Sequence, residues 1–345
     1  MAVTLQDIFA DPALFLYEFD KSDAIVQAMT REDFARSTFL DGRIRHGGRP
    51  AMRVPVAQLL AGYEAAKPPL PRIGWIFHVA QCGSTLLARA LDLPGRTLAL
   101  REPAALRRLG VAACSHQGQG PQQEELLDLT IALLGKRWEG EMATIVKANV
   151  PVNFIAKDLL ARDPQAPAIL LHLPLANYVA AILRTEGHVR WTEGVFDELH
   201  LARSPFCADA QPSSVAEKAA ALWFAQMTIF EDLLKTYPAT RSLDATQLFG
   251  RPGETVEAAG QVLGANLSPG EAQTIAAGEL FHSYSKNPAL DYDPEVRLAR
   301  EAEAMRRLER EIAEARDWAE TARERHGLAE ALDRPLVGGP AALLA

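Results

Sequence analysis

The chain has 345 residues, of which 48% are hydrophobic and 23% charged, which is an ordinary composition for one large domain or two smaller ones. Its formal net charge of −8 argues against nucleic-acid or membrane partners, because both need a basic surface. The three cysteines form no CxxC pair and are too few for a disulfide framework. We therefore expect a cytoplasmic protein without a metal site, of unknown oligomeric state.

Membrane insertion and secretion are not expected either. The N-terminal residues MAVTLQDIFADPALFLYEFD carry acids where a signal peptide needs a basic region. The most apolar long stretch, residues 167–183, is interrupted by His172, Pro174 and Asn177. This stretch predicts a strand followed by a helix rather than a membrane span.

Residues 1–70 predict an N-terminal extension of mixed structure, packed on the core. It contains a possible helix near Leu5–Ala10, an extended AIVQAM segment and the loop-rich segment STFLDGRIRHGGRP. The paired glycines Gly47 and Gly48, followed by Pro50, mark a turn.

From Ile73 onward, short apolar runs alternate with helical segments. The predicted strands are Ile73–Ala80, Thr97–Pro103, Thr144–Asn149, Ala168–Pro174 and Arg241–Ala245. The predicted helices are Pro121–Trp138, Pro151–Asp163, Leu175–Arg184, Ser214–Tyr237 and Gly253–Gly264. The strands are apolar throughout, as burial on both faces requires, so the pattern favours an α/β fold with a parallel sheet flanked by helices.

The last part of the chain, residues 293–345, has a different character. Residues 294–325 predict one long, charged surface helix, packed along the stripe Leu298, Met305, Leu308, Ile312 and Trp318. The segment RPLVGGPAALLA that follows predicts a disordered tail. The resulting division is an extension at 1–70, a core domain at 71–292 and a C-terminal helix with its tail.

The stretch GWIFHVAQCGSTLLARALD, Gly74–Asp92, combines an apolar strand, a small-residue turn and an amphipathic helix. Backbone N–H groups of Gly83, Ser84 and Thr85 at the helix start suit a phosphate. The ATP-type motif GxxxxGK[ST] would need glycine at His78 and lysine at Ser84, and the missing lysine argues against a nucleoside triphosphate. The alternative is a turn that merely caps a helix.

Two charged residues follow the next strands. Glu102 comes just after one strand and is a candidate general base, although it could instead cap the helix at Pro103 or pair with Arg101. Lys147 lies in an apolar strand, which suggests that it points into a polar pocket and stabilises negative charge. The alternative is that Lys147 lies at a frayed strand end, from which its side chain reaches water.

These motifs resemble the sulfotransferase family. The segment FHVAQCGSTLLARAL is similar to the family's 5′-phosphosulfate loop, and RSLDATQLFGRPGETVEAAGQVLG is similar to its late strand and helix. The resemblance, to a divergent bacterial branch, covers about Ile73 to Gly264. It implies a P-loop-like fold that binds 3′-phosphoadenosine 5′-phosphosulfate without a metal. It also implies roles for the loop residues Gln81, Cys82, Gly83, Ser84 and Thr85 in donor binding, and for Glu102 and Lys147 in catalysis.

Three positions depart from the family pattern. Gln81 replaces a lysine or arginine, so Lys147, Arg101 or Arg89 must supply that charge. His172 replaces the arginine that binds the 3′-phosphate, and Ala180 stands near the expected serine. The resemblance implies two contacts for this phosphate. One is His172, and the other is Lys286 in the polar loop HSYSKNPALDY.

The leading expectation is a sulfotransferase acting on a hydroxyl or amine of a small molecule or peptide, with residues 188–206 as an irregular, acceptor-binding lid. One alternative is a P-loop kinase or NTPase whose lysine is displaced to Lys147 or Lys286. Another is a non-catalytic nucleotide-binding protein, which Gln81, His172 and Ala180 favour. The acceptor cannot be read from the sequence.

Overall fold

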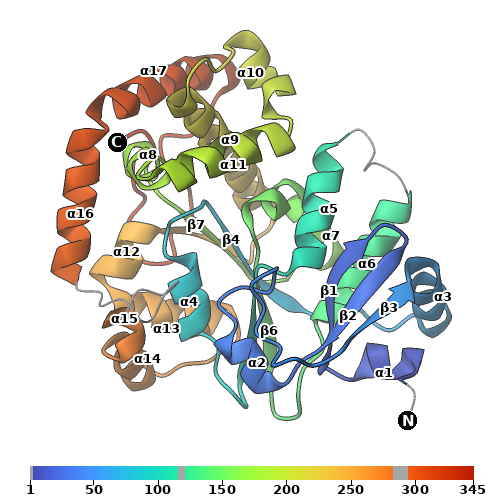
Figure 1. The fold of residues 1–345 in the computed structure, drawn as a ribbon. Helices are drawn as coiled ribbons and strands as arrows, with labels where there is room; N and C mark the ends of the chain where they lie inside the picture. Colours follow the sequence, from blue (N-terminus) through green and yellow to red (C-terminus); the bar gives the residue numbers. More distant parts are fainter. Residues whose placement is uncertain (1–2, 116–120, 283–293) are drawn as a thin grey trace.

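The computed structural model describes residues 3–115, 121–282 and 294–345. Its centre is a sheet of five parallel strands in the order β5-β6-β4-β7-β8 (Figure 1). The strands are β4 (Ile73–His78), β5 (Thr97–Arg101), β6 (Ala143–Lys147), β7 (Ala168–His172) and β8 (Thr240–Asp244). All five predicted strands are present, and every residue of β4, β5 and β7 is buried, as their continuous apolar runs require. The predicted α/β fold is confirmed.

Residues 3–70 form a small antiparallel sheet with three helices. The sheet has the order β1-β2-β3, with β1 (Leu14–Asp20), β2 (Asp23–Ala28) and β3 (Ala51–Pro55). The helices are α1 (Leu5–Ala10), α2 (Arg31–Arg36) and α3 (Val56–Ala66). Sequence reasoning found α1 and β2 but missed the other four elements. Two backbone hydrogen bonds attach this extension to the core. Leu40 N–H donates to the carbonyl of Arg101 at 2.7 Å, and Leu40 C=O accepts from Ala104 N–H at 3.1 Å.

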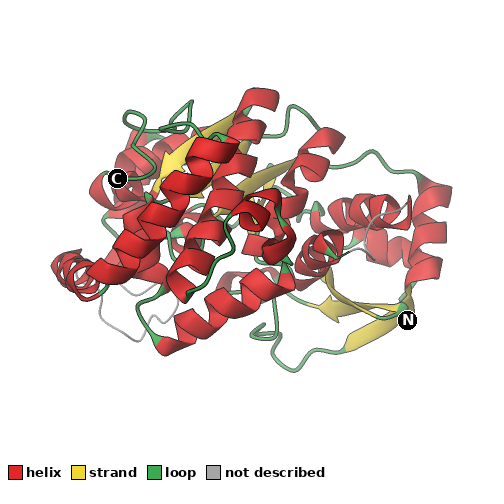
Figure 2. Cartoon of the chain, turned by 90° about the horizontal axis from the view of Figure 1, so that it is seen from above, coloured by secondary structure: helices red, strands yellow, loops and turns green. Residues whose placement is uncertain are grey.

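Helices cover the large sheet, and Figure 2 shows the small sheet beside the N terminus, at the opposite side from the C terminus. The core helices are α4 (Ser84–Ala90), α5 (Ala104–Cys114), α6 (Pro121–Leu134), α7 (Ala156–Arg162), α8 (Leu175–Ile182), α9 (Glu186–Glu198), α10 (Pro205–Asp209), α11 (Val215–Thr236), α12 (Ala245–Gly250), α13 (Pro252–Val262), α14 (Pro269–Ala276) and α15 (Glu279–His282). Two 3₁₀ turns are η1 (Val150–Ile155) and η2 (Leu201–Arg203). None of the helices in the described ranges has the length and apolar character that crossing a bilayer takes.

The segment 188–206 was predicted to be irregular, and this is wrong. Most of it lies in α9, η2 and α10. Thr185 caps α9 by accepting from His188 N–H at 3.3 Å, and Thr192, Val195 and Phe196 form its buried face. The high aromatic content of the segment concealed this helical spacing, which is the signal that predicts an amphipathic helix.

The prediction of a single C-terminal helix is also wrong in detail. It is broken at Leu308 into α16 (Pro294–Arg307) and α17 (Glu309–His326), which pack along α8 and α11 (Figure 1). Leu308, Ile312 and Trp318 of the predicted stripe are buried, whereas Leu298 is 56% exposed. The break lets the two pieces follow the curved surface formed by the core helices.

The tail after α17 is ordered against the core, contrary to the predicted disorder. Leu332 and Leu343 are buried in the main core. The tail also extends the sheet edge, because Ser242 N–H donates to Arg334 C=O at 3.1 Å and Leu336 N–H to Ser242 C=O at 2.7 Å. Glycine and proline content suggested disorder, but the apolar residues between them have a surface to cover.

Candidate functional site

The connections between strands make the end of β4 a natural binding position. The chain leaving β4 goes to β5 at one edge of the sheet, whereas the chain leaving β7 goes to β8 at the other edge. Connections that diverge in this way leave a crevice at the carboxyl ends of the strands, where open α/β sheets bind ligands. The small-residue turn before α4 lies at this point (Figure 1).

The turn has the geometry of an anion cradle. Gly83 is the N-cap of α4 with φ +81°, and no side chain caps the helix start. Within the described ranges, the N–H groups of Gly83, Ser84 and Thr85 find no backbone acceptor outside their own helix. A Cβ at Gly83 would lie 2.8 Å from Phe249 Cζ, so this position requires glycine for both backbone angle and space.

The residues around Gly83 are held firmly. Gln81 adopts φ +61°, an uncommon angle for a residue with a side chain. Cys82 is fully buried and its thiol donates to the carbonyl of Val79 at 2.7 Å, which makes it a packing residue of the turn. Ser84 and Thr85 are buried at the start of α4. The loop therefore has a fixed shape in which a bound anion would meet preset amides.

Glu102 and Lys147 are brought together as an ion pair. The Lys147 ammonium donates to Glu102 Oε1, with side-chain exposures of 1% for the lysine and 17% for the glutamate. Glu102 therefore neither caps the helix after Pro103 nor pairs with Arg101, and Lys147 does not reach water. Glu102 also has φ +58°, so the backbone holds the carboxylate in place at a cost in strain.

The environment keeps Glu102 ionised. Burial opposes its charge, but the nearby Lys147 ammonium and the Arg43 guanidinium outweigh burial and lower the Glu102 pKa below its ordinary value. Phe39 borders the pair from the N-terminal extension, with Lys147 Nζ 5.4 Å from its ring centre. Arg43 stacks on the same ring at 3.8 Å, so this wall combines an aromatic face with a cation.

A buried polar network that the sequence analysis missed continues from this pair. Burial, followed by the nearby Lys147 charge, lowers the pKa of His78 to about 3, so the imidazole is neutral at pH 7. Asn153 Nδ2 donates to the His78 carbonyl at 3.0 Å and to Gln226 Oε1 at 2.7 Å. Tyr178, which is fully buried in α8, lies within electrostatic range of Cys82 in the cradle.

Several atoms of this region are buried without a hydrogen-bond partner among the described residues. They are Asn149 Oδ1, Asn153 Oδ1 and His172 Nδ1. Buried polar groups are normally paired, so a cluster of unpaired ones at the strand ends points to a site that water or a ligand completes. The sequence signal was present: each is a polar residue in an otherwise apolar run.

The other predicted contacts are less suited to an anion. His172 is buried at the end of β7, and burial lowers its pKa to about 4, so it carries no positive charge at pH 7. Asp244 lies beside it and caps α12 by accepting from Thr246 N–H at 2.9 Å. Arg101 is buried on Asp92 and the backbone of the N-terminal extension, which is a structural role. Lys286 lies outside the described residues.

The arrangement thus joins an amide cradle, a fixed carboxylate–ammonium pair and a neutral histidine at the carboxyl ends of the strands. Such a set can hold an oxyanion, accept a proton and stabilise developing negative charge. Neither a protein-family model nor a curated protein sequence matches the chain.

Proposed function

We propose that the protein is a sulfotransferase-like enzyme. It would move a sulfonate from 3′-phosphoadenosine 5′-phosphosulfate to a hydroxyl or amine of a small molecule or peptide. The observation that carries this proposal is the buried Glu102–Lys147 pair beside a phosphate cradle that has no lysine of its own. Three cysteines are too few for a disulfide framework, which suits a reducing compartment, so we place the enzyme in the cytoplasm.

The residues of the cradle fit the 5′-phosphate end of the donor. The amides of Gly83, Ser84 and Thr85 would donate hydrogen bonds to its oxygens, and their fixed geometry avoids reorganisation on binding. The 3′-phosphate is less well served by the described residues, because His172 is neutral there. Lys286 remains the proposed cation for that phosphate.

In the proposed reaction Glu102 accepts the proton of the acceptor hydroxyl while the acceptor oxygen forms a bond to sulfur. The bond from sulfur to the bridging oxygen of the donor breaks, and 3′-phosphoadenosine 5′-phosphate leaves. Lys147 would neutralise charge on the sulfonate and bridging oxygens. A shift of Lys147 toward these oxygens would weaken its hold on Glu102, which raises the basicity of the carboxylate when it is needed.

Calorimetry with adenosine 3′,5′-bisphosphate and with ATP–magnesium tests the proposal. We expect bisphosphate binding on the order of micromolar and little ATP–magnesium binding. The cradle variant is Ser84→Ala with Thr85→Val, and it should weaken bisphosphate binding about tenfold or more by removing two hydroxyl donors. Gly83→Asp is unsuitable, because a Cβ would lie 2.8 Å from Phe249 Cζ at a backbone angle that strains any side chain, so the loop itself would have to shift.

The half-buried residue Thr321 on α17, which lies outside the strand-end site, provides the control, since Thr321→Ala should bind like the wild type. Tight, magnesium-dependent ATP binding would instead favour a kinase or NTPase that uses Lys147 as its displaced lysine. Bisphosphate binding without transfer to a broad acceptor panel would favour the non-catalytic alternative.

A further inference from the structure

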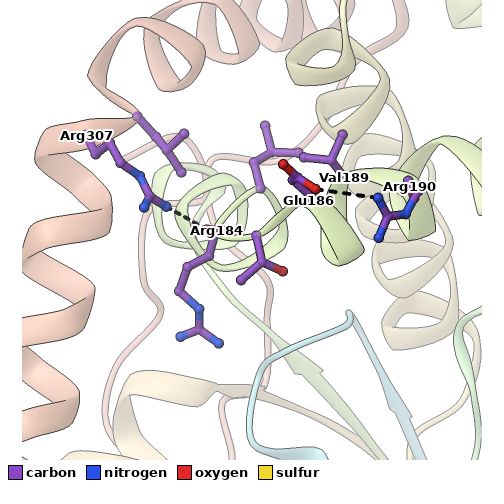
Figure 3. Close-up of a pocket in the computed structure, with 8 residues that line it drawn as sticks. Arg184, Glu186, Val189, Arg190 and Arg307 are labelled. Carbon is purple, nitrogen blue, oxygen red and sulfur yellow. Dashed lines mark hydrogen bonds and ion pairs between the residues drawn. The ribbon is translucent and has the colours of Figure 1, made fainter.

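A second candidate site lies where α8, α9, α16 and α17 meet. A cavity of about 410 Å³ opens there between the end of α8, the first turn of α9 and the break at Leu308 (Figure 3). This volume falls within the roughly 300–1,000 Å³ of small-molecule pockets. It shares no lining residue with the strand-end site, so it is independent of the proposed function.

The wall of the cavity is mainly apolar. Leu183 and Leu308 are 5% and 7% exposed, and Val189 completes the surface. These three side chains come from the α8–α9 connection, from α9 and from the helix break. The apolar body of a ligand would displace water from the remaining exposed surface of these side chains, most of which belongs to the half-buried Val189.

Three arginines, Arg184, Arg190 and Arg307, surround this apolar wall, against one acid, Glu186 (Figure 3). Glu186 lies 3.7 Å from Arg190, and both side chains are largely exposed, so this pair is weak. Arg307 donates one hydrogen bond, to the Arg184 carbonyl at 2.6 Å. Arginines thus outnumber acids among the residues that line the cavity.

Arg184 is the most informative of the three. Its side chain is half-buried, and within the described ranges it makes neither an ion pair nor a hydrogen bond. In Figure 3 its guanidinium extends away from Arg307 and carries no interaction. The first turn of α9 adds N–H groups of Glu186 and Gly187 that have no acceptor in the described chain.

We infer that this cavity binds a small amphipathic anion, with an apolar body against Leu183, Val189 and Leu308 and an oxyanion head on the Arg184 guanidinium. A guanidinium fork matches carboxylate and phosphate oxygens in pairs, which a hydroxyl head cannot exploit. The common chemistry is an oxyanion on an apolar chain, and the head group can be a carboxylate or a phosphate ester.

Calorimetry on the full chain with four probes tests this inference: octanoate, octyl phosphate, octan-1-ol and inorganic phosphate. We expect octanoate or octyl phosphate to bind at least about tenfold more tightly than the alcohol or the free phosphate, because both parts of the ligand contribute. The tighter of the two identifies the head group. Binding of octan-1-ol as tight as that of the charged probes, or of free phosphate as tight as octyl phosphate, would overturn the inference.

Variants locate the site. Arg184→Gln should weaken binding about tenfold, because it removes the partner of the head group. The exposed Arg307→Gln should weaken it less, because Arg307 donates to the Arg184 carbonyl. Val189→Glu should abolish it by placing a carboxylate inside the cavity. Arg108→Gln is the matched control. Arg108 is exposed on α5, and its ion pair with Glu18, at 3.9 Å, is long and therefore weak. Unchanged binding in both Arg184→Gln and Arg307→Gln, with unchanged melting temperatures, would refute the site.

Discussion

At the scale of single residues, the Glu102–Lys147 pair decides the chemistry that the strand-end site can perform. Glu102→Gln keeps the size of the side chain but removes the proton acceptor. We expect transfer to fall by about 10²–10⁴, the usual contribution of a general base. Binding of adenosine 3′,5′-bisphosphate should remain. A transfer assay beside calorimetry measures both, and an unchanged rate would remove Glu102 from the mechanism.

The same substitution leaves Lys147 buried without a counter-charge. Breaking a buried ion pair costs about 3–5 kcal/mol, whereas replacing both partners by uncharged residues is often neutral. The double variant Glu102→Gln with Lys147→Met should therefore unfold at a higher urea concentration than Glu102→Gln alone. This comparison separates loss of catalysis from loss of fold.

How much of this site was predictable depends on where each residue comes from. Glu102 and Lys147 stand out in the sequence because charged residues rarely follow or interrupt apolar strands, although their pairing with each other was not foreseen. Gln226 and Tyr178 come from α11 and α8, and only the tertiary packing of those helices brings them to the site. Their roles, like those of the cradle residues, remain predictions.

At the scale of elements, some glycines are required because the backbone of a neighbouring element lies too close for a Cβ atom. A Cβ at Gly110 of α5 would lie 2.6 Å from the Pro151 carbonyl oxygen of η1. Gly194 of α9 has no atom within 4 Å of the corresponding position. The two glycines are therefore a matched pair, one required by packing and one exposed.

We expect Gly110→Ala to destabilise the protein by about 1–3 kcal/mol, as overpacking against rigid backbone does. Gly194→Ala should instead stabilise it by about 0.5–1 kcal/mol, because alanine is the better helix former. Urea unfolding of both variants measures the difference. Equal effects of the two substitutions would mean that α5 can move away from η1 without penalty.

Sequence reasoning located elements well where hydrophobic periodicity was strong, and poorly where tertiary contacts define them. The five parallel strands were visible as continuous apolar runs. The strands β1 and β3 were missed because each is only partly buried, so the apolar pattern is diluted. The helix α9 was missed because aromatic and charged residues share its short segment.

At the scale of the whole molecule, the last residues fasten distant parts of the fold to one another. Besides its contacts with β8, the tail supplies the Leu343 carbonyl, which accepts from Leu175 N–H at 2.8 Å. Leu175 begins α8, whose N-cap residue Pro174 makes no side-chain capping bond. The tail thus caps the helix that follows β7 and connects it to the sheet edge.

Removal of residues 328–345 should therefore destabilise the whole protein rather than trim a free end. The truncated chain loses the burial of Leu328, Leu332 and Leu343. Each buried leucine contributes about 1.5–3 kcal/mol, so we expect a loss of at least about 3 kcal/mol in the free energy of unfolding. Urea unfolding measures this, with deletion of the exposed Ala345 alone as the control. Coincident unfolding curves for the truncated and intact chains would mean that the tail packs without stabilising the fold.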